Sequence, residues 1–197
     1  PAPVTGVLIS EVASGGVTGG SDNFIEIANF GDVDVDVSGW RIFRCGQAGD
    51  AYGPQAVAPA GTVLAPGETY TAVREGSALA AAGVGDATYG TSLHSFGFGA
   101  YLETAEFDVV DRVGFYHPSV DTECKNPVAL QNVASWAHGE SHQRVALTGD
   151  VTQDWAVAPR TPGEPNAAEG QDLTIDSDVA ITEFAPGGPG GYGDDFI

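Results

Sequence analysis

Methionine and basic residues are scarce in this sequence. There is no methionine at all, and seven Lys and Arg residues stand against 27 Asp and Glu residues, which gives a formal net charge of −20. Because nucleic-acid binding depends on clustered Lys and Arg, this shortage argues against a DNA or RNA partner. An anionic surface indicates solubility, binding of counter-ions or divalent cations, or a life in high salt, and charge alone leaves all three open.

Long apolar segments are also missing. No run approaches the roughly 18 to 20 apolar residues that a membrane-spanning helix requires, so we expect no membrane insertion. The sequence starts at Pro1 and lacks methionine, which fits a mature product trimmed of its leader, or a fragment. We therefore expect a secreted protein that is extracellular or attached to the cell surface.

Cysteine occurs only twice. Cys45 and Cys124 are 124 − 45 = 79 residues apart, which is too far for a CxxC metal or redox motif. We expect them to form a single structural disulfide, which would close a long loop and contribute ~4 kcal/mol on the chain-entropy account. The alternative is a pair of buried thiols in a reducing compartment, but disulfides are typical of secreted chains.

What the sequence does contain is a series of short β-prone runs separated by Gly, Pro and Asp. Together with a hydrophobic content of 42%, these closely spaced runs predict an all-β sandwich with long loops. A short helix is expected at 77–82, where Ser77 can cap its start and Gly83 ends it. The predicted strands span 7–13, 24–29, 33–37, 40–43, 63–64, 69–74, 101–102, 107–115, 143–147 and 155–157.

The region 21–43 predicts a hairpin. Valines at 33, 35 and 37 alternate with aspartates at 32, 34 and 36, and this period of two indicates a strand with one apolar and one acidic face. Ser38 and Gly39 supply turn chemistry, after which Trp40 starts a second strand. We expect Trp40 to be a large anchor in the core.

The end of the chain partly repeats its beginning. Residues 181–197 match residues 9–25 at nine of 17 positions without a gap, including an Ile-x-Glu strand and an Asp-x-Phe-Ile strand. We interpret 1–168 as one sandwich, 169–178 as an acidic linker, and 179–197 as the first strands of an incomplete second copy. An incomplete copy cannot bury its own core, so it is available for addition to an exposed sheet edge. The candidate assembly residues in it are Ile181, Glu183, Phe184, Phe196 and Ile197.

Several pieces of the sequence, in order, resemble the lamin tail domain, an immunoglobulin-like β-sandwich found in nuclear lamins and in many secreted bacterial proteins. Their order and spacing over 7–166 carry the resemblance. Departures are Phe30, where the family usually has proline, and the long segment with Cys124. The matching pieces are Ile9-x-Glu11-Val12, Asn23-Phe-Ile-Glu-Ile-x-Asn29, Val35-x-Val37-Ser-Gly-Trp40, Leu64-x-Pro-Gly67, Val110-Asp-Arg-Val113, Asp154-Trp155 and Thr161-Pro-Gly-x-Pro-Asn166.

The resemblance implies a non-catalytic module rather than an enzyme. Two functions follow as alternatives. The first is a structural or interaction module, tandem or self-assembling, whose partners are proteins, with copies of itself among the candidates. The second is an accessory domain of a secreted hydrolase such as a nuclease or phosphoesterase. The family has no catalytic or ligand-binding residues to carry over, and fold analogy alone cannot supply a function.

Acidic side chains form the candidate calcium site. Asp32, Asp34 and Asp36 are predicted on one strand face and Asp22 beside a Gly-rich loop, and hard cations prefer such oxygen ligands. No EF-hand loop is present, and successive aspartates on a strand face are nearly 7 Å apart. A solvated acidic face without a cofactor is the alternative.

Other polar residues suit structural roles. His138 and His142, with His117, have the residue types for zinc, but Gly139 disfavours a helix there and the segment departs from the HExxH pattern. His94 lies beside two serines and could act as their base, but the sequence has no Gly-x-Ser-x-Gly nucleophile elbow.

Glu11 and Glu26 lie in predicted strands, and we expect each to pair with an arginine such as Arg41 or Arg112.

Overall fold

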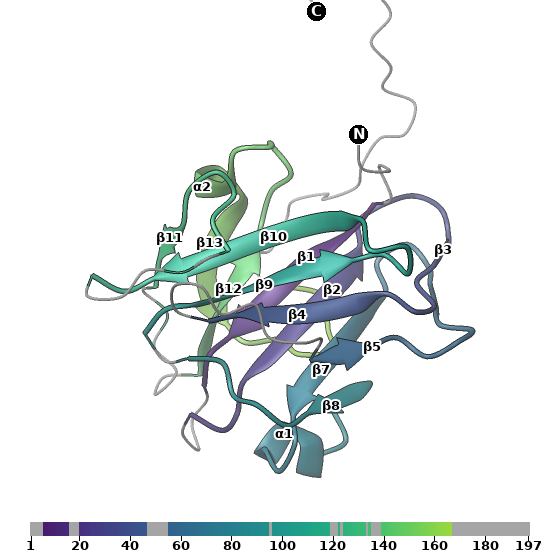
Figure 1. The fold of residues 1–197 in the computed structure, drawn as a ribbon, viewed down its shortest axis with the longest axis horizontal. Coiled ribbons are helices and arrows are strands. Elements are labelled where there is room, and N and C mark those ends of the chain that lie inside the picture. The colour runs from purple at the N-terminus through teal and green to yellow at the C-terminus, as the bar shows by residue number, and fades with distance from the viewer. Residues whose placement is uncertain are drawn as a thin grey trace, which may run out of the picture.

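The structure, a computed structural model, is a two-layer β-sandwich (Figure 1). It describes residues 6–15, 20–46, 55–94, 96–118, 122, 124–132, 134 and 139–166. The six-stranded sheet has the order β13 (Trp155–Pro159), β12 (Glu140–Arg144), β1 (Val7–Ala13), β2 (Phe24–Asn29), β7 (Thr69–Arg74), β8 (Ala87–Tyr89). The five-stranded sheet has the order β11 (Leu130–Gln131), β10 (Val109–Tyr116), β9 (Phe98–Glu103), β4 (Arg41–Cys45), β5 (Ala56–Val57). The all-β prediction is therefore confirmed.

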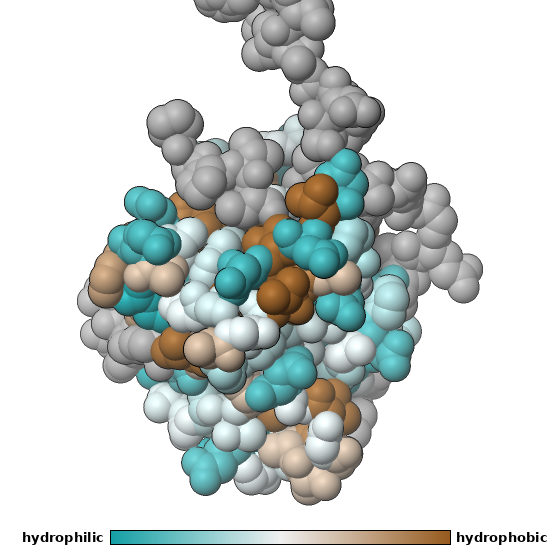
Figure 2. All heavy atoms as spheres, turned by 90° about the vertical axis from the view of Figure 1, so that its right-hand side faces the viewer, coloured by the Kyte–Doolittle hydropathy of each residue, from teal (hydrophilic) through white to brown (hydrophobic). Residues whose placement is uncertain are grey.

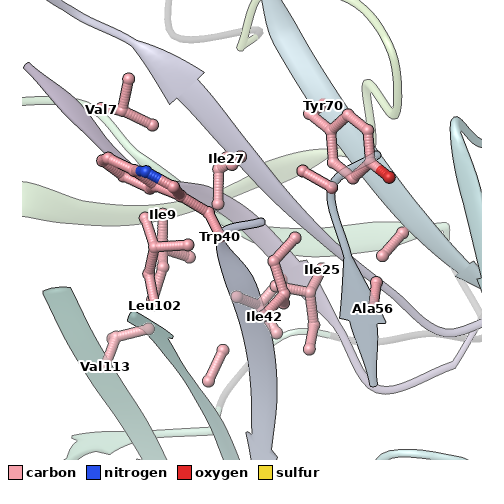
Figure 3. Close-up of a cluster of buried hydrophobic side chains, with 14 of the residues drawn as sticks. Val7, Ile9, Ile25, Ile27, Trp40, Ile42, Ala56, Tyr70, Leu102 and Val113 are labelled. Atoms are coloured by element: carbon pink, nitrogen blue, oxygen red, sulfur yellow. The ribbon is translucent and has the colours of Figure 1, made fainter. Parts of the chain in front are cut away.

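The core lies between the two sheets. Ile9, Ile25 and Ile27 of the six-stranded sheet face side chains of the five-stranded sheet that include Ile42 and Leu102 (Figure 3). Each of these five side chains is at most 2% exposed. The alternation of isoleucines in β1 and β2 places every second side chain on this face, as a strand period of two requires.

The predicted hairpin over 33–43 is wrong, although its anchor is right. Trp40 is buried in the core, as expected. The first strand shrinks to β3 (Val35–Asp36), which pairs with β6 (Val63–Leu64) and not with β4. Val33 is 64% exposed. The side of the molecule that carries β3 mixes apolar and hydrophilic side chains (Figure 2). The alternation holds only at its end, where Val35 packs against the core and Val37 is buried.

Local signals in the middle of the chain are confirmed. The Pro66-Gly67 turn is closed by a 2.9 Å hydrogen bond from the Glu68 N–H to the Ala65 carbonyl, with Gly67 at φ 80°, as expected for glycine in a turn of this kind. Helix α1 (Ala78–Ala81) follows Ser77, whose hydroxyl accepts a hydrogen bond from the Ala80 N–H at 3.0 Å.

The closing strands begin and end differently from the prediction. β12 ends at Arg144, and the N–H of the next residue, Val145, bonds the carbonyl of Asp154 at 2.7 Å. The carboxylate of Asp154 also accepts hydrogen bonds from the N–H and hydroxyl of Thr148. These bonds fold the chain back through helix α2 (Val151–Asp154) into β13. The predicted strand over 143–147 is thus shifted toward the N-terminus.

A buried ion pair sits where β1 bulges. The register between β1 and β2 shifts between Ile9, which pairs with Ile27, and Glu11, which leaves Ser10 as the extra residue of a bulge. The backbone of Ile9 lies beside this bulge. Its N–H donates to Asp111 and its carbonyl accepts from Arg144. Arg144 and Asp111 bond each other at 2.7 Å, so side chains from two strands, β10 and β12, satisfy the backbone beside the bulge.

Candidate functional site

Glu26 lies on the outer face of the six-stranded sheet and is completely buried. Its carboxylate accepts three hydrogen bonds, from the hydroxyls of Ser10 (2.9 Å) and Thr71 (2.7 Å) and from the N–H of Gly163 (2.7 Å). The predicted arginine partner is wrong, because all three of these donors are neutral. Burial raises the pKa of Glu26 from 4.5 to about 7.

Glu11 stands opposite Glu26 in the β1–β2 register and is also completely buried. It accepts hydrogen bonds from the hydroxyl of Ser141 at 2.5 Å and from the N–H and hydroxyl of Thr161 at 3.0 and 2.9 Å. Burial raises its pKa as well. The hydrogen-bond donors to Glu11 are again neutral. However, burial lowers the pKa of Arg160 and the charge of Glu11 acts to raise it, so an arginine other than Arg41 and Arg112 lies nearby.

The two glutamates therefore clamp the turn at 161–166 onto the outer face of the sheet. Asn166 completes the attachment with hydrogen bonds from its side-chain amide to the carbonyls of Ser10 (3.0 Å) and Arg144 (2.9 Å). This explains why β2 is buried along its whole length. The sequence showed the Thr-Pro-Gly and Pro-Asn turn residues but not what they would cover.

The disulfide attaches the segment around Cys124 to the outer face of the five-stranded sheet. Cys45 and Cys124 are joined, with Cα atoms 5.8 Å apart. Cys45 lies opposite Gly99 in β9, and Gly99 lies opposite Gly114 in β10. A Cβ on Gly114 would lie 2.7 Å from the carbonyl oxygen of Cys124. The two glycines thus let the backbone around Cys124 lie directly on the sheet.

Aromatic and arginine side chains form the next rows on this face. Phe43 and Tyr101 are opposite each other in register and stack at 4.4 Å between ring centroids. The guanidinium of Arg112 lies 5.6 Å from the Tyr101 ring and that of Arg41 lies 3.5 Å from the Phe107 ring. Both arginines named as partners of the buried glutamates are therefore on the opposite sheet.

β13 is the longest of the four strands that end the two sheets. It has five residues, whereas β8, β5 and β11 have three, two and two. It contains no charged residue, and its proline, Pro159, is its last residue. Edge strands are usually protected by charge, proline or short length. β13 therefore offers the least protected edge among the described strands.

The backbone of Val157 points to this free edge. Hydrogen bonds from Val145 to Asp154 and from Arg160 to Gly139 bracket the β12–β13 ladder. In an antiparallel pair, hydrogen-bonded and non-hydrogen-bonded positions alternate. This places the N–H and carbonyl of Val157 away from β12, and no residue in the described ranges bonds them.

A protein-family comparison identifies the fold. The family model described as the Lamin Tail Domain matches residues 1–117. The chain belongs to the lamin tail domain family. A search of curated proteins finds no match to it.

Lamin tail domains are immunoglobulin-like structural and interaction modules rather than an enzyme family. In this member the matched region ends in the loop after β10, whereas β12, β13 and the 161–166 turn lie beyond it. Those later segments supply the donors for Glu11 and the edge at Val157. Among the helices in the described ranges, none is long and apolar enough to cross a membrane.

The candidate calcium ligands stay apart in this lamin tail domain. Asp32, Asp34 and Asp36 are exposed, and the N–H and hydroxyl of Ser38 lower the pKa of Asp36. Asp22 is buried and accepts a 2.8 Å hydrogen bond from the N–H of Ala78 at the start of α1. Within the part of the chain described, no three His, Cys, Asp or Glu residues are grouped to hold a metal ion.

The histidines within the described ranges do not converge either. His142 is 3% exposed, stacks on Phe115 at 4.0 Å and lies 3.0 Å from the side-chain oxygen of Asn132. Burial lowers its pKa to about 3. His117 packs edge-on against Phe96, and His94 is exposed. His138 lies outside the described residues, as do the linker at 169–178 and the assembly residues Ile181, Glu183, Phe184, Phe196 and Ile197.

Proposed function

We propose that this chain is a non-catalytic extracellular interaction module that accepts an extended strand from a second copy at the edge of β13. The observation that carries the proposal is the uncharged five-residue edge with the outward-facing backbone of Val157. Strand addition uses such unpaired backbone groups for affinity. The disulfide between Cys45 and Cys124 supports an extracellular location.

The donor strand that we propose is in 179–197. These residues repeat the Ile-x-Glu pattern of β1 and the Asp-x-Phe-Ile start of β2. In the complete domain, β1 and β2 pair side by side in the sheet that ends with β13. A copy of the same pattern is therefore suited to extend that sheet. Repeated addition would join copies into an array through protein contacts alone.

The test is the oligomeric state of the full chain, measured by sedimentation velocity from about 10 to 500 µM. Val157→Pro removes the outward N–H without removing a bond to β12. We expect it to weaken self-association about tenfold, the effect of losing roughly one hydrogen bond. Val157→Ala keeps the N–H and is the matched control, with association within about twofold of the wild type.

A synthetic peptide covering residues 179–197 gives a second measurement that needs no variant. An excess of it should compete with the donor strand and shift the full chain toward monomer. A chain that is monomeric at every concentration would refute the proposal. Equal association of the two Val157 variants, both folded, would place the interface elsewhere.

A further inference from the structure

A groove with a volume of about 600 Å³ lies beside the first half of β7. One wall comes from β6 and the turn before β7, including Val63 and Gly67, and another from Gly163 in the turn that the buried glutamates clamp. The floor contains Thr69 and Tyr70. This groove is separate from the β13 edge, since β12, β1 and β2 lie between β13 and β7.

Tyr70 lines this groove and carries an unused hydroxyl. The residue is 5% exposed, and its hydroxyl has no hydrogen-bond partner among the described residues. The oxygen lies on the side of the ring away from Ile27 and Trp40 (Figure 3). Burial, followed by the charge of Asp86, raises the pKa of Tyr70, so the hydroxyl stays protonated as a donor. A buried donor without an acceptor is costly to the fold and suggests that a ligand supplies the acceptor.

The backbone at Thr69 is also open to the groove. β7 pairs with β2 over its whole length, but β8 pairs only with residues 72–74. The bond from the Asn29 N–H to the Glu68 carbonyl fixes the alternation of the β2–β7 ladder. By that alternation, the N–H and carbonyl of Thr69 point away from β2. An extended peptide could therefore pair with this short stretch of sheet edge.

Two carboxylates give the groove its charge. Glu68 and Asp86 both line it, and the lining residues include no Lys, Arg or His. One oxygen of each carboxylate accepts a backbone N–H, from Ala65 at 2.9 Å and from Thr71 at 2.8 Å. These bonds hold the side chains in place and leave the second oxygens for a ligand. The charge is complementary to an ammonium or guanidinium group.

We propose that this groove binds an extended segment of another protein through a Lys or Arg side chain. The cation would bond Glu68 and Asp86, a carbonyl of the segment would accept the Tyr70 hydroxyl, and its backbone would pair with Thr69. The ligand cannot be this chain's own C-terminal region, because residues 167–197 contain no Lys or Arg. The site thus serves a partner different from the strand donor for β13.

The binding test uses the ¹⁵N-labelled full chain and a capped nonapeptide of sequence GSVTRVTSG, followed by NMR. We expect the peptide to shift the amide signals of Thr69, Tyr70 and Asp86. The matched peptide has citrulline, which is neutral and nearly isosteric, in place of arginine. Its affinity should be lower by about tenfold or more, because it loses charge-assisted hydrogen bonds. Equal binding of both peptides, or no shifts at these residues, would overturn the proposal.

Variants separate a binding role from a structural one. Tyr70→Phe should weaken peptide binding about three- to tenfold. It should not lower the melting temperature, because the hydroxyl has no partner within the fold. Glu68→Gln should also weaken binding, whereas Glu75→Gln removes an exposed charge outside the groove and should leave it unchanged. Val157→Pro should not alter peptide binding, so failure of one proposal is distinguishable from failure of the other. Unchanged binding to Tyr70→Phe and Glu68→Gln would refute the site.

Discussion

At the scale of single residues, the buried glutamates differ most from expectation. The strand period of two places Glu26 on the face opposite Ile25 and Ile27. If solvent covered this face, an arginine would be a suitable partner for the Glu26 carboxylate. Instead the turn at 161–166 covers this face, and neutral hydroxyl and amide donors bind the carboxylates. Such donors offset the loss of hydration only partly, so burial and the neighbouring Glu11 keep the pKa of Glu26 high.

This raised pKa predicts how stability changes with pH. The folded state holds the Glu26 proton more tightly than the unfolded state, whose pKa is near 4.5. The stabilisation is therefore present below pH 4.5 and is lost as the pH rises through 7. Glu26→Gln stays neutral at every pH. Relative to wild type, it should gain up to about 3 kcal/mol of unfolding free energy between pH 4 and pH 8.

Urea unfolding of both proteins at pH 4, 6 and 8 measures this difference. His142 opposes the trend in both proteins, because its lowered pKa removes stability as the pH falls from 6.5 toward 3. Comparing variant with wild type at each pH cancels that contribution. A difference that stays constant with pH would contradict the assignment of Glu26.

At the scale of elements, the sequence predicted strands best where the pattern was long. β1 and β2 have the predicted bounds because alternating apolar residues fill one face of each. The turn at Pro66-Gly67 and the cap at Ser77 are local chemistry and were also predictable. The pairing of β3 with β6, and the two-residue strands β5 and β11, depend on segments distant in the chain. No local pattern encodes such pairings.

The contact between the Cys124 segment and the five-stranded sheet gives a prediction for Gly114. A Cβ there would lie 2.7 Å from both the carbonyl oxygen of Cys124 and the Cγ2 of Thr122. Overpacking of this kind costs about 1–3 kcal/mol. In a protein of this size, we expect Gly114→Ala to lower the melting temperature by about 3 °C or more.

Gly90→Ala is the matched control, since a Cβ at Gly90 meets no atom within 4 Å. Calorimetry of both variants with the disulfide intact should show a lower melting temperature for Gly114→Ala alone. If both variants melt like the wild type, the Cys124 segment does not pack on the sheet as described.

At the scale of the whole molecule, the family match and the folded unit differ in extent. The Lamin Tail Domain match ends at residue 117. However, β12 covers one edge of β1, Trp155 lies in the core, and Thr161 binds Glu11. The sandwich prediction for 1–168 came from motifs at both ends of the domain. The order of the motifs did not reveal that the turn at 161–166 is bound to the buried carboxylates of Glu11 and Glu26.

Truncation therefore distinguishes the two extents. A chain ending at residue 117 loses β12, β13 and the donors for Glu11, which leaves a buried edge and a carboxylate without its partners. We expect it to show no cooperative unfolding, since losing one partner of a buried polar group alone costs about 1–3 kcal/mol.

A chain ending at residue 168 keeps these contacts and the amide of Asn166. It should melt within about 3 °C of the full chain. Cys45→Ser in all three proteins, together with Cys124→Ser in the two that contain it, leaves no unpaired thiol. Near-ultraviolet circular dichroism against temperature reports the packing of the aromatic core. Cooperative melting of the 117-residue chain would show that the matched region folds alone and that the later strands only add to it.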